Sequence, residues 1–431
     1  MPQFKPGDVV QTVTGMPVTV KKYLAAGGQG EVYIADFNGE DKALKWYKRN
    51  VLPNPDKFYT NLKNNAAKGA PDPSFLWPIT VTEREYGSFG YVMDLRDPEY
   101  HELTEFLVAD VKFVSFKAAV EACIRIASAF RILHNNGMCY QDMNDGNFFI
   151  NPKTGKVLIC DNDNAAPNLS DTFILGTPGY MAPEVVLGQA QPSTSTDRFS
   201  LAVVLYMILC NEHPLEGRRW TKACLTPADE RKLYGSMPLF VYDPDNDDNR
   251  PVPGVHNNEI MRWKFMPSYV QDAFIKALSQ DALKNPGKRM RELDWLKVLV
   301  RFQGDIVSCP SCGGEVFVTD ASDTPCDTCQ QMLQVTHTLK LLDYSVTAAR
   351  KTRVYRCQID PSCNADSALD QVVRVVSRKD KPGVLGLMNA TDNVILGITP
   401  SGKVNQVKPG DVVPLKAGIR LQVYDAEIGI Q

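Results

Sequence analysis

Two short segments near the middle of the chain carry side chains suited to phosphoryl transfer. In residues 140–147, Asp142 is followed five positions later by Asn147, and Asp161 comes directly after a short apolar run at residues 156–160. An aspartate can accept the proton of an attacking hydroxyl, while an asparagine and a second aspartate can hold Mg²⁺ against phosphate groups. Taken alone this pattern is weak, because Asp and Asn are also common in ordinary turns.

The elements that must position these side chains follow from the hydrophobic periodicity. Residues 116–136 have apolar side chains at helical spacing and lead into the 140–147 segment. Residues 8–46 alternate apolar and polar positions around turns, which predicts an antiparallel sheet. We therefore expect an α+β fold.

A glycine-containing turn lies between two of the predicted strands. Gly27, Gly28 and Gly30 would let the backbone approach phosphate oxygens, and Val32 follows on the next strand. Lys45, about fifteen residues past Gly30, could contact the same phosphates. A plain hairpin turn explains the glycines equally well, and a lone strand lysine is usually a solvated edge charge.

Residues 176–184, Gly-Thr-Pro-Gly-Tyr-Met-Ala-Pro-Glu, make the pattern specific. They resemble the substrate-docking loop of Ser/Thr protein kinases, at the expected distance from the two carboxylate segments. Residues 140–147 and 161–163 likewise resemble the kinase catalytic loop and metal-binding motif in degenerate form. The resemblance covers about residues 15–302 and implies a bilobal protein-kinase-like fold that binds ATP and Mg²⁺.

The resemblance also implies roles for individual residues. The catalytic positions would be Asp142 as proton acceptor, Lys45 on the α/β-phosphates, Asn144 at the family's lysine position, and Thr177 bonded to Asp142. The Mg²⁺ ligands would be Asn147 and Asp161. The nucleotide would further contact the glycine loop (Gly27, Gly28, Gly30), Val32 over the adenine, Met93 as gatekeeper, and the backbone of Asp94 and Arg96.

The chain departs from the family pattern at several of these places. The helix after Lys45 should supply a glutamate that holds the lysine, but the only acid before Asp72 is Asp56, which looks like a helix start. Thr60 or Asn61 occupies the glutamate position. The lysine clamp is therefore in doubt.

The two catalytic motifs also differ from the family. Gln141 stands where the family has an arginine that binds a phosphate on the activation loop. Residues 161–163 are Asp-Asn-Asp where the family has Asp-Phe-Gly. Asp163 could add a carboxylate near the metal, or it could be a solvated or turn-capping residue. These departures keep a second interpretation open, in which the chain is a pseudokinase that binds nucleotide and docks partners.

Three further residues are assigned structural roles. His134 would end the long helix, and Asp197 would anchor the backbone of the catalytic loop. Arg289 would pair with Glu184 in a salt bridge. None of these requires participation in chemistry.

Four cysteines in two Cys-x-x-Cys pairs follow the kinase-like region. Cys309, Cys312, Cys326 and Cys329 have the spacing of a closed, structural four-thiolate zinc site. The alternative is two disulfides, which would need an oxidising compartment. No Lys or Arg lies between the two pairs, which argues against nucleic-acid binding by this cysteine region.

From residue 341 onward, short runs of β-forming residues alternate with Gly, Pro, Asn and Asp. They predict a small all-β sandwich whose ending resembles a forkhead-associated domain, without that family's Arg and Ser pattern. The expected domains are a kinase-like domain over 1–302 (lobes 1–95 and 96–302), a zinc ribbon over 303–340, and the β-sandwich module over 341–431.

Composition describes an ordinary globular chain. It has 431 residues, a net charge of −3 and 11 cysteines, with no basic field for a nucleic-acid partner. The start lacks the apolar core of a signal peptide, and the longest apolar run is too short to span a bilayer. With the odd cysteine count, this predicts a cytoplasmic location without membrane attachment.

The chain as a whole resembles the divergent bacterial Hanks-type Ser/Thr kinases that carry Asp-Asn-Asp, a zinc ribbon and a β module. The resemblance implies protein substrates. Some members of that subgroup are encoded beside a metal-dependent protein phosphatase and a von Willebrand A protein, which are therefore expected partners. A third, weaker interpretation is transfer of another group, such as AMP.

Overall fold

The computed structural model describes residues 2–170, 176–220, 225–319, 323–378, 380–381 and 383–431. Its contacts divide the chain into two compact units. Unit 1 comprises Met1–Phe113, Ile132–Lys264 and Phe274–Met290, and unit 2 comprises Val114–Arg131, Phe265–Ala273 and Arg291–Gln431. The sequence predicts three domains in chain order, with boundaries at residues 302 and 340. Each of the two units instead combines separate stretches of the chain, so they do not test these boundaries, which stay a prediction.

Unit 1 begins with the antiparallel sheet that the alternation predicts. Its six strands run in the order β1-β2-β3-β4-β6-β5. Their bounds are β1 Val9–Gln11, β2 Pro17–Ala26, β3 Gly30–Phe37, β4 Glu40–Tyr47, β5 Thr80–Val81 and β6 Gly90–Asp94. One face of the sheet buries a cluster that includes Phe4, Tyr33 and Trp46, and the opposite face buries a second cluster that includes Ala43, Tyr91 and Met93. Side chains alternate between the two faces because successive residues of a strand point in opposite directions.

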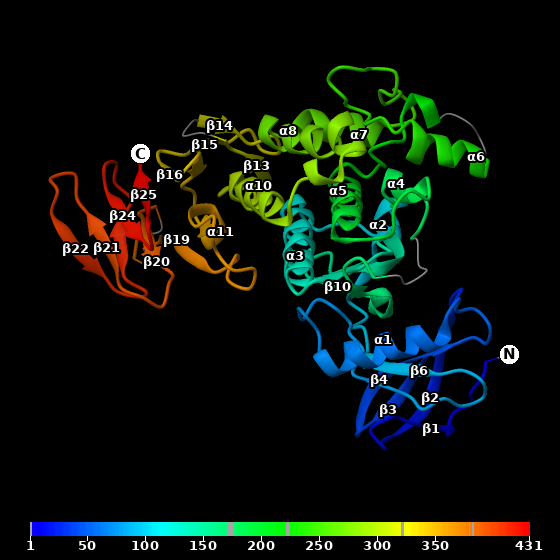
Figure 1. Ribbon diagram of the computed structural model, residues 1–431. Helices are drawn as coiled ribbons and strands as arrows, with labels where there is room; N and C mark the ends of the chain where they lie inside the picture. Colours follow the sequence, from blue (N-terminus) through cyan, green and yellow to red (C-terminus); the bar gives the residue numbers. More distant parts are fainter. Residues whose placement is uncertain (1, 171–175, 221–224, 320–322, 379, 382) are drawn as a thin grey trace. The chain divides into compact units, whose positions relative to one another are not determined.

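Helix α1 (Pro55–Lys68) covers the second face of this sheet (Figure 1). Its start is fixed by Asn54, whose side chain accepts a hydrogen bond from the backbone N–H of Lys57, and by Pro55 in the first turn. Tyr59 and Leu62 of α1 belong to the same buried cluster as the sheet residues. The predicted helix start near Asp56 is therefore confirmed.

The following part of the chain is mainly helical. The helices are α2 Leu103–Leu107, α3 Phe116–Asn135, α4 Pro183–Val186, α5 Thr194–Cys210, α6 Pro227–Glu230, α7 Asn257–Phe265, α8 Ser268–Ala277, α9 Gln280–Lys284 and α10 Glu292–Asp305. Short strands pair between them as β10-β9-β7 and β11-β8, with bounds β7 His101–Glu102, β8 Met138–Cys139, β9 Phe148–Ile150, β10 Val157–Ile159 and β11 Ala166–Pro167. Helix α5 is buried on almost all sides, which identifies it as a core helix.

Arg289 and Glu184 form the predicted ion pair. The guanidinium donates from Nη1 and Nη2 to the two carboxylate oxygens at 2.8 and 2.7 Å. Nη1 also donates to the backbone oxygen of Ser195 at 3.0 Å. Two parallel bonds to a planar carboxylate fix the geometry of the pair, so Arg289 connects α4, which carries Glu184, to the start of α5.

Unit 2 contains two small hairpins followed by two larger sheets. The hairpins pair β12 (Ile306–Ser308) with β13 (Glu315–Phe317), and β14 (Asp323–Pro325) with β15 (Met332–Gln334). The larger sheets have the orders β17-β16-β25-β24-β21-β22 and β18-β19-β20-β23. Their strands are β16 Thr338–Lys340, β17 Ser345–Thr347, β18 Arg353–Tyr355, β19 Gln371–Ser377, β20 Leu385–Asn389, β21 Ile395–Ile398, β22 Val404–Val407, β23 Val412–Pro414, β24 Arg420–Val423 and β25 Ala426–Ile430.

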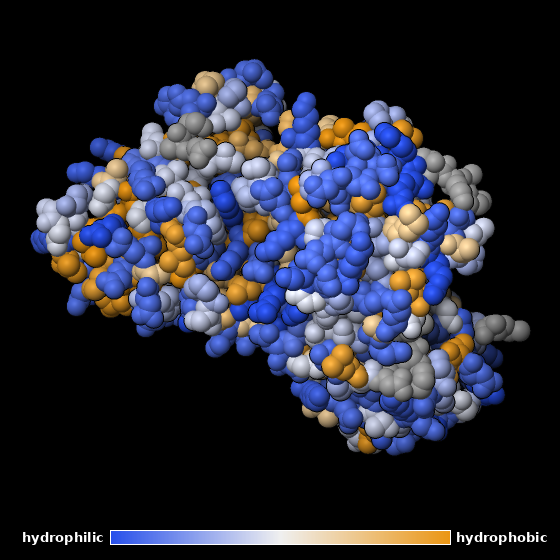
Figure 2. All heavy atoms as spheres, turned by 45° about the horizontal axis from the view of Figure 1, so that its top comes forward, coloured by the Kyte–Doolittle hydropathy of each residue, from blue (hydrophilic) through white to orange (hydrophobic). Residues whose placement is uncertain are grey.

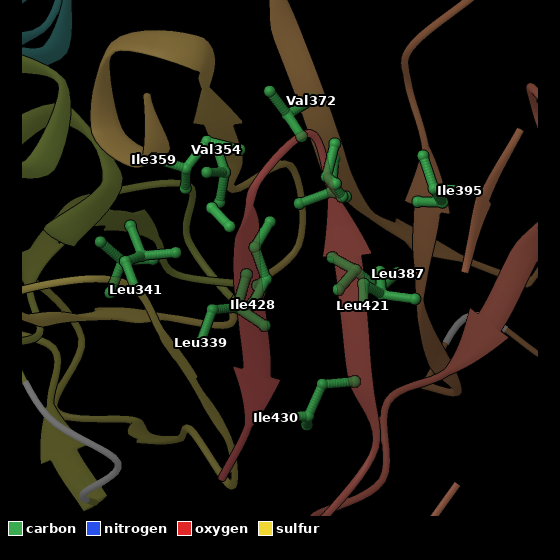
Figure 3. Close-up of a cluster of buried hydrophobic side chains, with 14 of the residues drawn as sticks. Leu339, Leu341, Val354, Ile359, Val372, Leu387, Ile395, Leu421, Ile428 and Ile430 are labelled. Carbon is green, nitrogen blue, oxygen red and sulfur yellow. The ribbon is translucent and has the colours of Figure 1, made fainter. Parts of the chain in front are cut away.

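One apolar cluster joins the two larger sheets. Val354 and Leu387 come from the four-stranded sheet, whereas Leu421 and Ile428 come from the six-stranded one (Figure 3). The C-terminal part is thus built of β-sheets around a core of its own. Its likeness to a forkhead-associated domain stays a prediction.

The molecular surface is mostly hydrophilic on the face drawn in Figure 2, with hydrophobic residues in small groups. Exposed apolar side chains include Val394 just before β21, Val404 of β22 and Val412 of β23. Single exposed apolar residues are normal for folded proteins. Among the helices described, none combines the length and the apolar character needed to cross a membrane.

Candidate active site and cysteine cluster

Helix α3 leads into the segment that carries Asp142. The side chain of Asp197, on α5, accepts hydrogen bonds from the backbone of that segment. The carboxylate of Asp197 accepts hydrogen bonds from the backbone N–H groups of Tyr140 at 2.6 Å and Gln141 at 3.1 Å. It also lies 3.0 Å from Nε2 of His134. The predicted anchor is therefore present, and His134 contributes to it as a buried structural residue. Gln141 has a φ of +77°, a strained conformation that these bonds help to maintain.

Asp142 lies in a network of short polar side chains. Oγ1 of Thr177 donates to Oδ1 of Asp142 at 2.8 Å, as the sequence predicts. Asn144 approaches both of these residues, with Nδ2 3.4 Å from Oδ1 of Asp142 and 3.3 Å from Oγ1 of Thr177. Asn147 donates from Nδ2 to the backbone oxygen of Asp142 at 2.8 Å. The structure thus brings together four of the predicted site residues.

The environment of Asp142 raises the pKa of its carboxyl group. Burial is the largest cause, because it disfavours the charged form. The hydrogen bonds from Thr177 and Asn144 act in the opposite direction, and the nearby charges of Asp161 and Asp163 raise the pKa further. A raised pKa makes this carboxylate a better proton acceptor than a fully solvated aspartate.

Asp161 follows strand β10 and is tied to the same network through the backbone. The N–H of Cys160 donates to the backbone oxygen of Asn147 at 2.9 Å, and the hydroxyl of Tyr140 donates to the backbone oxygen of Cys160. Asp161 itself is in the left-handed conformation with φ +50°. Its side chain is 44% exposed, so its carboxylate is accessible to a cation.

Lys45 forms ion pairs with two carboxylates of this loop. Its Nζ lies 3.0 Å from Oδ1 of Asp161 and 3.0 Å from Oδ2 of Asp163. Burial alone would lower the pKa of Lys45, but the charges of Asp163 and then Asp161 outweigh it, so the pKa is raised. The predicted phosphate-binding lysine is therefore charged.

Asp163 is not solvated, which corrects one of the alternatives stated for it. Its side chain is 0% exposed. Besides Lys45, it accepts hydrogen bonds from the hydroxyl of Tyr47 and, at 3.3 Å, from that of Tyr91. It occupies a buried polar site rather than the surface of a turn.

Helix α1 contacts this loop through amides. Nδ2 of Asn61 and Nδ2 of Asn65 both donate to the backbone oxygen of Ala165, at 2.9 and 2.7 Å. Thr60, the other residue considered for the glutamate position, bonds the backbone of Asp56 within its own helix. Neither Thr60 nor Asn61 contacts Lys45 in the hydrogen bonds described, so α1 holds the loop and not the lysine.

The predicted nucleotide-binding residues of the sheet share one face. In the strand register Val32 is opposite Lys45, and Lys45 is opposite Tyr91. Met93 lies two positions after Tyr91 on β6, opposite Ala43, so its side chain is on the same face of the sheet as those of Lys45 and Tyr91. The sheet therefore presents Val32, Lys45 and Met93 side by side.

The glycine loop joins β2 to β3. Gly27 and Gly28 are exposed, with open space around each Cα. Gly30 is different, because a Cβ there would lie 2.5 Å from the backbone oxygen of Trp46. The sheet thus requires glycine at position 30 for packing reasons, whatever the loop binds.

At the end of β6, Asp94 is exposed and forms an ion pair with Lys42 at 2.8 Å. The guanidinium of Arg96 lies 4.2 Å from the ring centroid of Phe149. These contacts involve side chains only. The roles expected of the two backbones, as of the other nucleotide contacts, stay predictions.

The donor set fits ATP and Mg²⁺. Asp161 and Asn147 offer oxygen atoms of the kind that Mg²⁺ prefers, and Lys45 offers a charged amine to phosphate. Lys45 is paired with Asp161 and Asp163 here, and a bound phosphate would share this amine with them. The residues that would hold the nucleotide and metal are therefore close together in unit 1.

Unit 2 holds the four cysteines as one cluster. Their sulfur atoms all lie within 4.8 Å of one another. The Sγ atoms of Cys309 and Cys329 are 3.7 Å apart, and those of Cys312 and Cys326 are 3.6 Å apart. A tetrahedral zinc with Zn–S bonds of about 2.3 Å places its sulfurs about 3.8 Å apart. The spacing therefore fits zinc and is far too long for disulfides, whose S–S bond is about 2.05 Å.

The backbone around the cysteines supports this geometry. The N–H of Gly314 donates to Sγ of Cys312 at 3.4 Å, and a Cβ at Gly314 would lie 2.9 Å from Oγ1 of Thr328. Cys309 and Cys326 share a small buried cluster with Val316, Val318 and Leu333. Such a small core gains most of its stability from a bound metal.

The sequence analysis missed the tyrosines that support Asp163. Tyr47 lies two residues after Lys45 on β4, on the same side of the strand, and Tyr91 is opposite Lys45 on β6. The sequence did contain one signal for Asp163. A buried lysine needs a carboxylate partner, and α1 has no glutamate. Asp163, the second acid of the 161–163 motif, was therefore a candidate partner for Lys45.

Comparison with known proteins supports a kinase relationship for the central part of the chain. A protein kinase domain profile matches residues 87–285, a range that includes Asp142, Asn147, Asp161 and Thr177 but not Lys45. Mouse (Mus musculus) protein kinase C delta type is 28% identical over 207 residues, which cover 46% of this chain and 30% of the mouse protein. Serine/threonine-protein kinase PknA of Mycobacterium tuberculosis is 28% identical over 210 residues, or 46% of this chain and 48% of PknA.

A third relative, serine/threonine-protein kinase YPK3 of Saccharomyces cerevisiae, is 30% identical over 156 residues, covering 33% of this chain and 28% of YPK3. The chain spans less than half the length of each of these relatives. Residues 87–285 are therefore similar to a protein kinase domain, with distant relatives among the serine/threonine kinases.

Proposed function

We propose that the protein transfers the γ-phosphoryl group of ATP to serine or threonine hydroxyls of protein substrates, with Mg²⁺. The observation that carries this proposal is the hydrogen bond from Thr177 to Asp142, within a network that also includes Asn144 and Asn147. A nucleotide-binding scaffold has no need of a desolvated carboxylate held by the substrate-docking segment.

In this proposal Asp142 orients the substrate hydroxyl and accepts its proton. The hydroxyl oxygen forms a bond to the γ-phosphorus while the bond from phosphorus to the β–γ bridging oxygen breaks, releasing ADP. Lys45 holds the phosphates, and Asn147 and Asp161 would hold Mg²⁺, which neutralises charge on the phosphate oxygens when it is bound. Thr177 and Asn144 fix the carboxylate for this transfer.

A pseudokinase is the second candidate, and Asn144 is the feature that favours it. The family's lysine at this position supplies positive charge near the transferred phosphate, and Asn144 supplies none. Its amide lies within hydrogen-bond distance of Asp142 and Thr177 instead. Under this interpretation the nucleotide binds without transfer, and the C-terminal sheets dock partners. A metal-dependent phosphatase and a von Willebrand A protein remain partners suggested by the family resemblance alone.

Incubation with γ-labelled and α-labelled ATP tests the proposal. We expect label in protein from γ-labelled ATP only, and its loss by at least about 100-fold in Asp142→Asn with ATP binding retained. Asp110→Asn, a change at an exposed acid, is the matched control. Label from α-labelled ATP would indicate transfer of AMP. Unchanged labelling in Asp142→Asn would refute the kinase assignment, and ATP binding without any labelling would favour the pseudokinase.

A further inference from the structure

We propose that Asp163 positions Lys45 for the nucleotide phosphates, taking the role that the kinase resemblance gives to a glutamate on helix α1. The inference rests on the proposed function, because it assigns Lys45 to ATP. It adds a positioning residue that lies on the same loop as the candidate metal ligand Asp161.

The contacts of Asp163 show how firmly it is held. Both of its oxygens lie within reach of Nζ of Lys45, at 3.2 and 3.0 Å. Each oxygen also accepts a hydrogen bond from a tyrosine hydroxyl, Oδ2 from Tyr47 and Oδ1 from Tyr91. The Asp163 side chain is 0% exposed, and these contacts give both of its oxygens hydrogen-bond partners.

Asp161 is a weaker candidate for this role. It contacts Lys45 through one oxygen at 3.0 Å, and its side chain is 44% exposed. If it serves as a metal ligand, its charge is shared with the cation and it holds the lysine less strongly. Asp163 is enclosed and keeps its contact with Lys45 when phosphates and metal arrive.

Helix α1 offers no carboxylate for the lysine. Its only acid is Asp56, in the first turn, which forms an exposed ion pair with Arg84 at 2.5 Å. The residues of α1 that face the loop are Asn61 and Asn65, and both bond the backbone oxygen of Ala165. The carboxylate that pairs with Lys45 thus comes from residues 161–163. Helix α1 supports it indirectly, by holding the backbone two residues further along and by packing Phe58 against Tyr47.

The place of the clamp carboxylate decides whether movement of α1 can control activity. Where a helix carries the clamp carboxylate, displacement of the helix breaks the ion pair. Here Lys45 pairs with a buried carboxylate of the loop that Tyr47 and Tyr91 also hold, so the ion pair does not depend on a carboxylate carried by α1. Changes in the contacts of α1 should therefore affect the lysine much less than changes at Asp163.

The test compares Asp163→Asn with the control Asp56→Asn in the 431-residue chain. We expect Asp163→Asn to raise the dissociation constant and KM of Mg·ATP by at least about tenfold, with a smaller change in kcat, while the control variant stays within about twofold of the parent. Thermal melting of each variant checks folding. Tyr47→Phe, which keeps the charge of Asp163 but removes one donor, should give a smaller increase in the same direction and serves if Asp163→Asn does not fold.

A second readout is independent of catalysis. Without nucleotide, a small amine-acylating reagent at pH 8 should modify Lys45 faster in Asp163→Asn than in the parent, because the amine has then lost one of its two carboxylate partners. Unchanged ATP affinity and unchanged acylation in a folded Asp163→Asn would overturn the inference. If the parent binds ATP but transfers no phosphate, the proposed function fails while these binding and acylation results still decide the role of Asp163.

Discussion

Oγ1 of Thr177 donates a hydrogen bond of 2.8 Å to Oδ1 of Asp142, across 35 residues of sequence. This bond connects the substrate-docking segment to the proposed base. It is also one of two hydrogen bonds that lower the pKa of Asp142, against a larger opposing effect of burial. The same bond thus bears on both the position and the protonation of the carboxylate.

The first prediction concerns the pH dependence of phosphoryl transfer. Only deprotonated Asp142 can accept a proton, so activity should fall as pH decreases through its raised pKa. Thr177→Ala and Asn144→Ala each remove a bond that lowers this pKa, so the acidic limb of the profile should move to higher pH in both variants. We also expect activity at the optimum to fall by about tenfold or more in Thr177→Ala, because the base is less well oriented.

Profiles of kcat against pH for the parent and both variants check this prediction. Ser170→Ala, in the same segment but without a described bond to Asp142, is the control and should keep the parental profile. An acidic limb that moves to lower pH in Thr177→Ala would contradict the account of Asp142.

A second prediction concerns Glu259, which is buried on α7 beside Tyr206. Burial raises the pKa of this carboxyl to about 8, and the hydrogen bond donated by Tyr206 only partly opposes the shift. Between the ordinary value of 4.5 and about 8, the unfolded chain loses this proton while the folded chain keeps it. Stability should therefore be highest below pH 4.5 for this group and should fall as pH rises, by at most about 1.4 kcal/mol per pH unit.

Denaturant midpoints at pH 5, 7 and 8.5 for the parent and Glu259→Gln test this. Between pH 5 and pH 8.5 the stability of Glu259→Gln should fall less than that of the parent. The stability of Asp248→Asn, a control at an exposed residue, should fall as much as that of the parent. Identical pH dependence in the parent and Glu259→Gln would show that Glu259 is ionised in the folded state at neutral pH.

The third prediction concerns the cysteine cluster. The purified protein should contain about one zinc per chain, and Cys326→Ser should lose most of it, because a closed site needs all four sulfurs. Cys309 and Cys326 form the buried cluster described for this region together with three apolar residues, so metal loss should open the region to proteolysis. Metal analysis and limited proteolysis measure the two effects. Asp327→Ala, an exposed change inside the same Cys-x-x-Cys pair, should keep the zinc. A zinc-free parent with four free thiols would exclude the site.

Much of the fold could be predicted because its signals are local. Strands β19 and β22 have the bounds that the β-forming runs at 371–377 and 404–407 indicate. Short strands such as β16 and β25 could not be predicted, since their pairing joins residues about ninety positions apart and leaves little trace in either segment. The burial of Asp163 and its tyrosine partners could not be predicted for a similar reason. Whether a carboxylate is buried depends on partners far along the chain, and its two tyrosines lie 116 and 72 residues away.

The last prediction is that activity depends little on phosphorylation of the segment between Asp161 and Glu184. A phosphate there usually orders the segment through an arginine before the catalytic aspartate, in bonds worth roughly a few kcal/mol. Gln141 stands at that position and carries no charge. Asn162 is buried and donates to the backbone oxygen of Ile159 at 2.8 Å, which fixes the loop without a phosphate.

The candidate acceptors are Ser170, Thr172 and Thr177. The hydroxyl oxygen of Ser170 is buried, Thr172 lies outside the described residues, and Thr177 is already bonded to Asp142. We therefore compare the parent with a Ser170→Ala/Thr172→Ala double variant, each before and after phosphatase treatment, with mass spectrometry to verify removal of phosphate. The kinase activities of all four samples should agree within about threefold, since position 141 offers no cation to bind a phosphate. A loss of activity by orders of magnitude, in the double variant or after treatment of the parent, would mean that another cation of the chain binds the phosphate and that the site is not pre-formed.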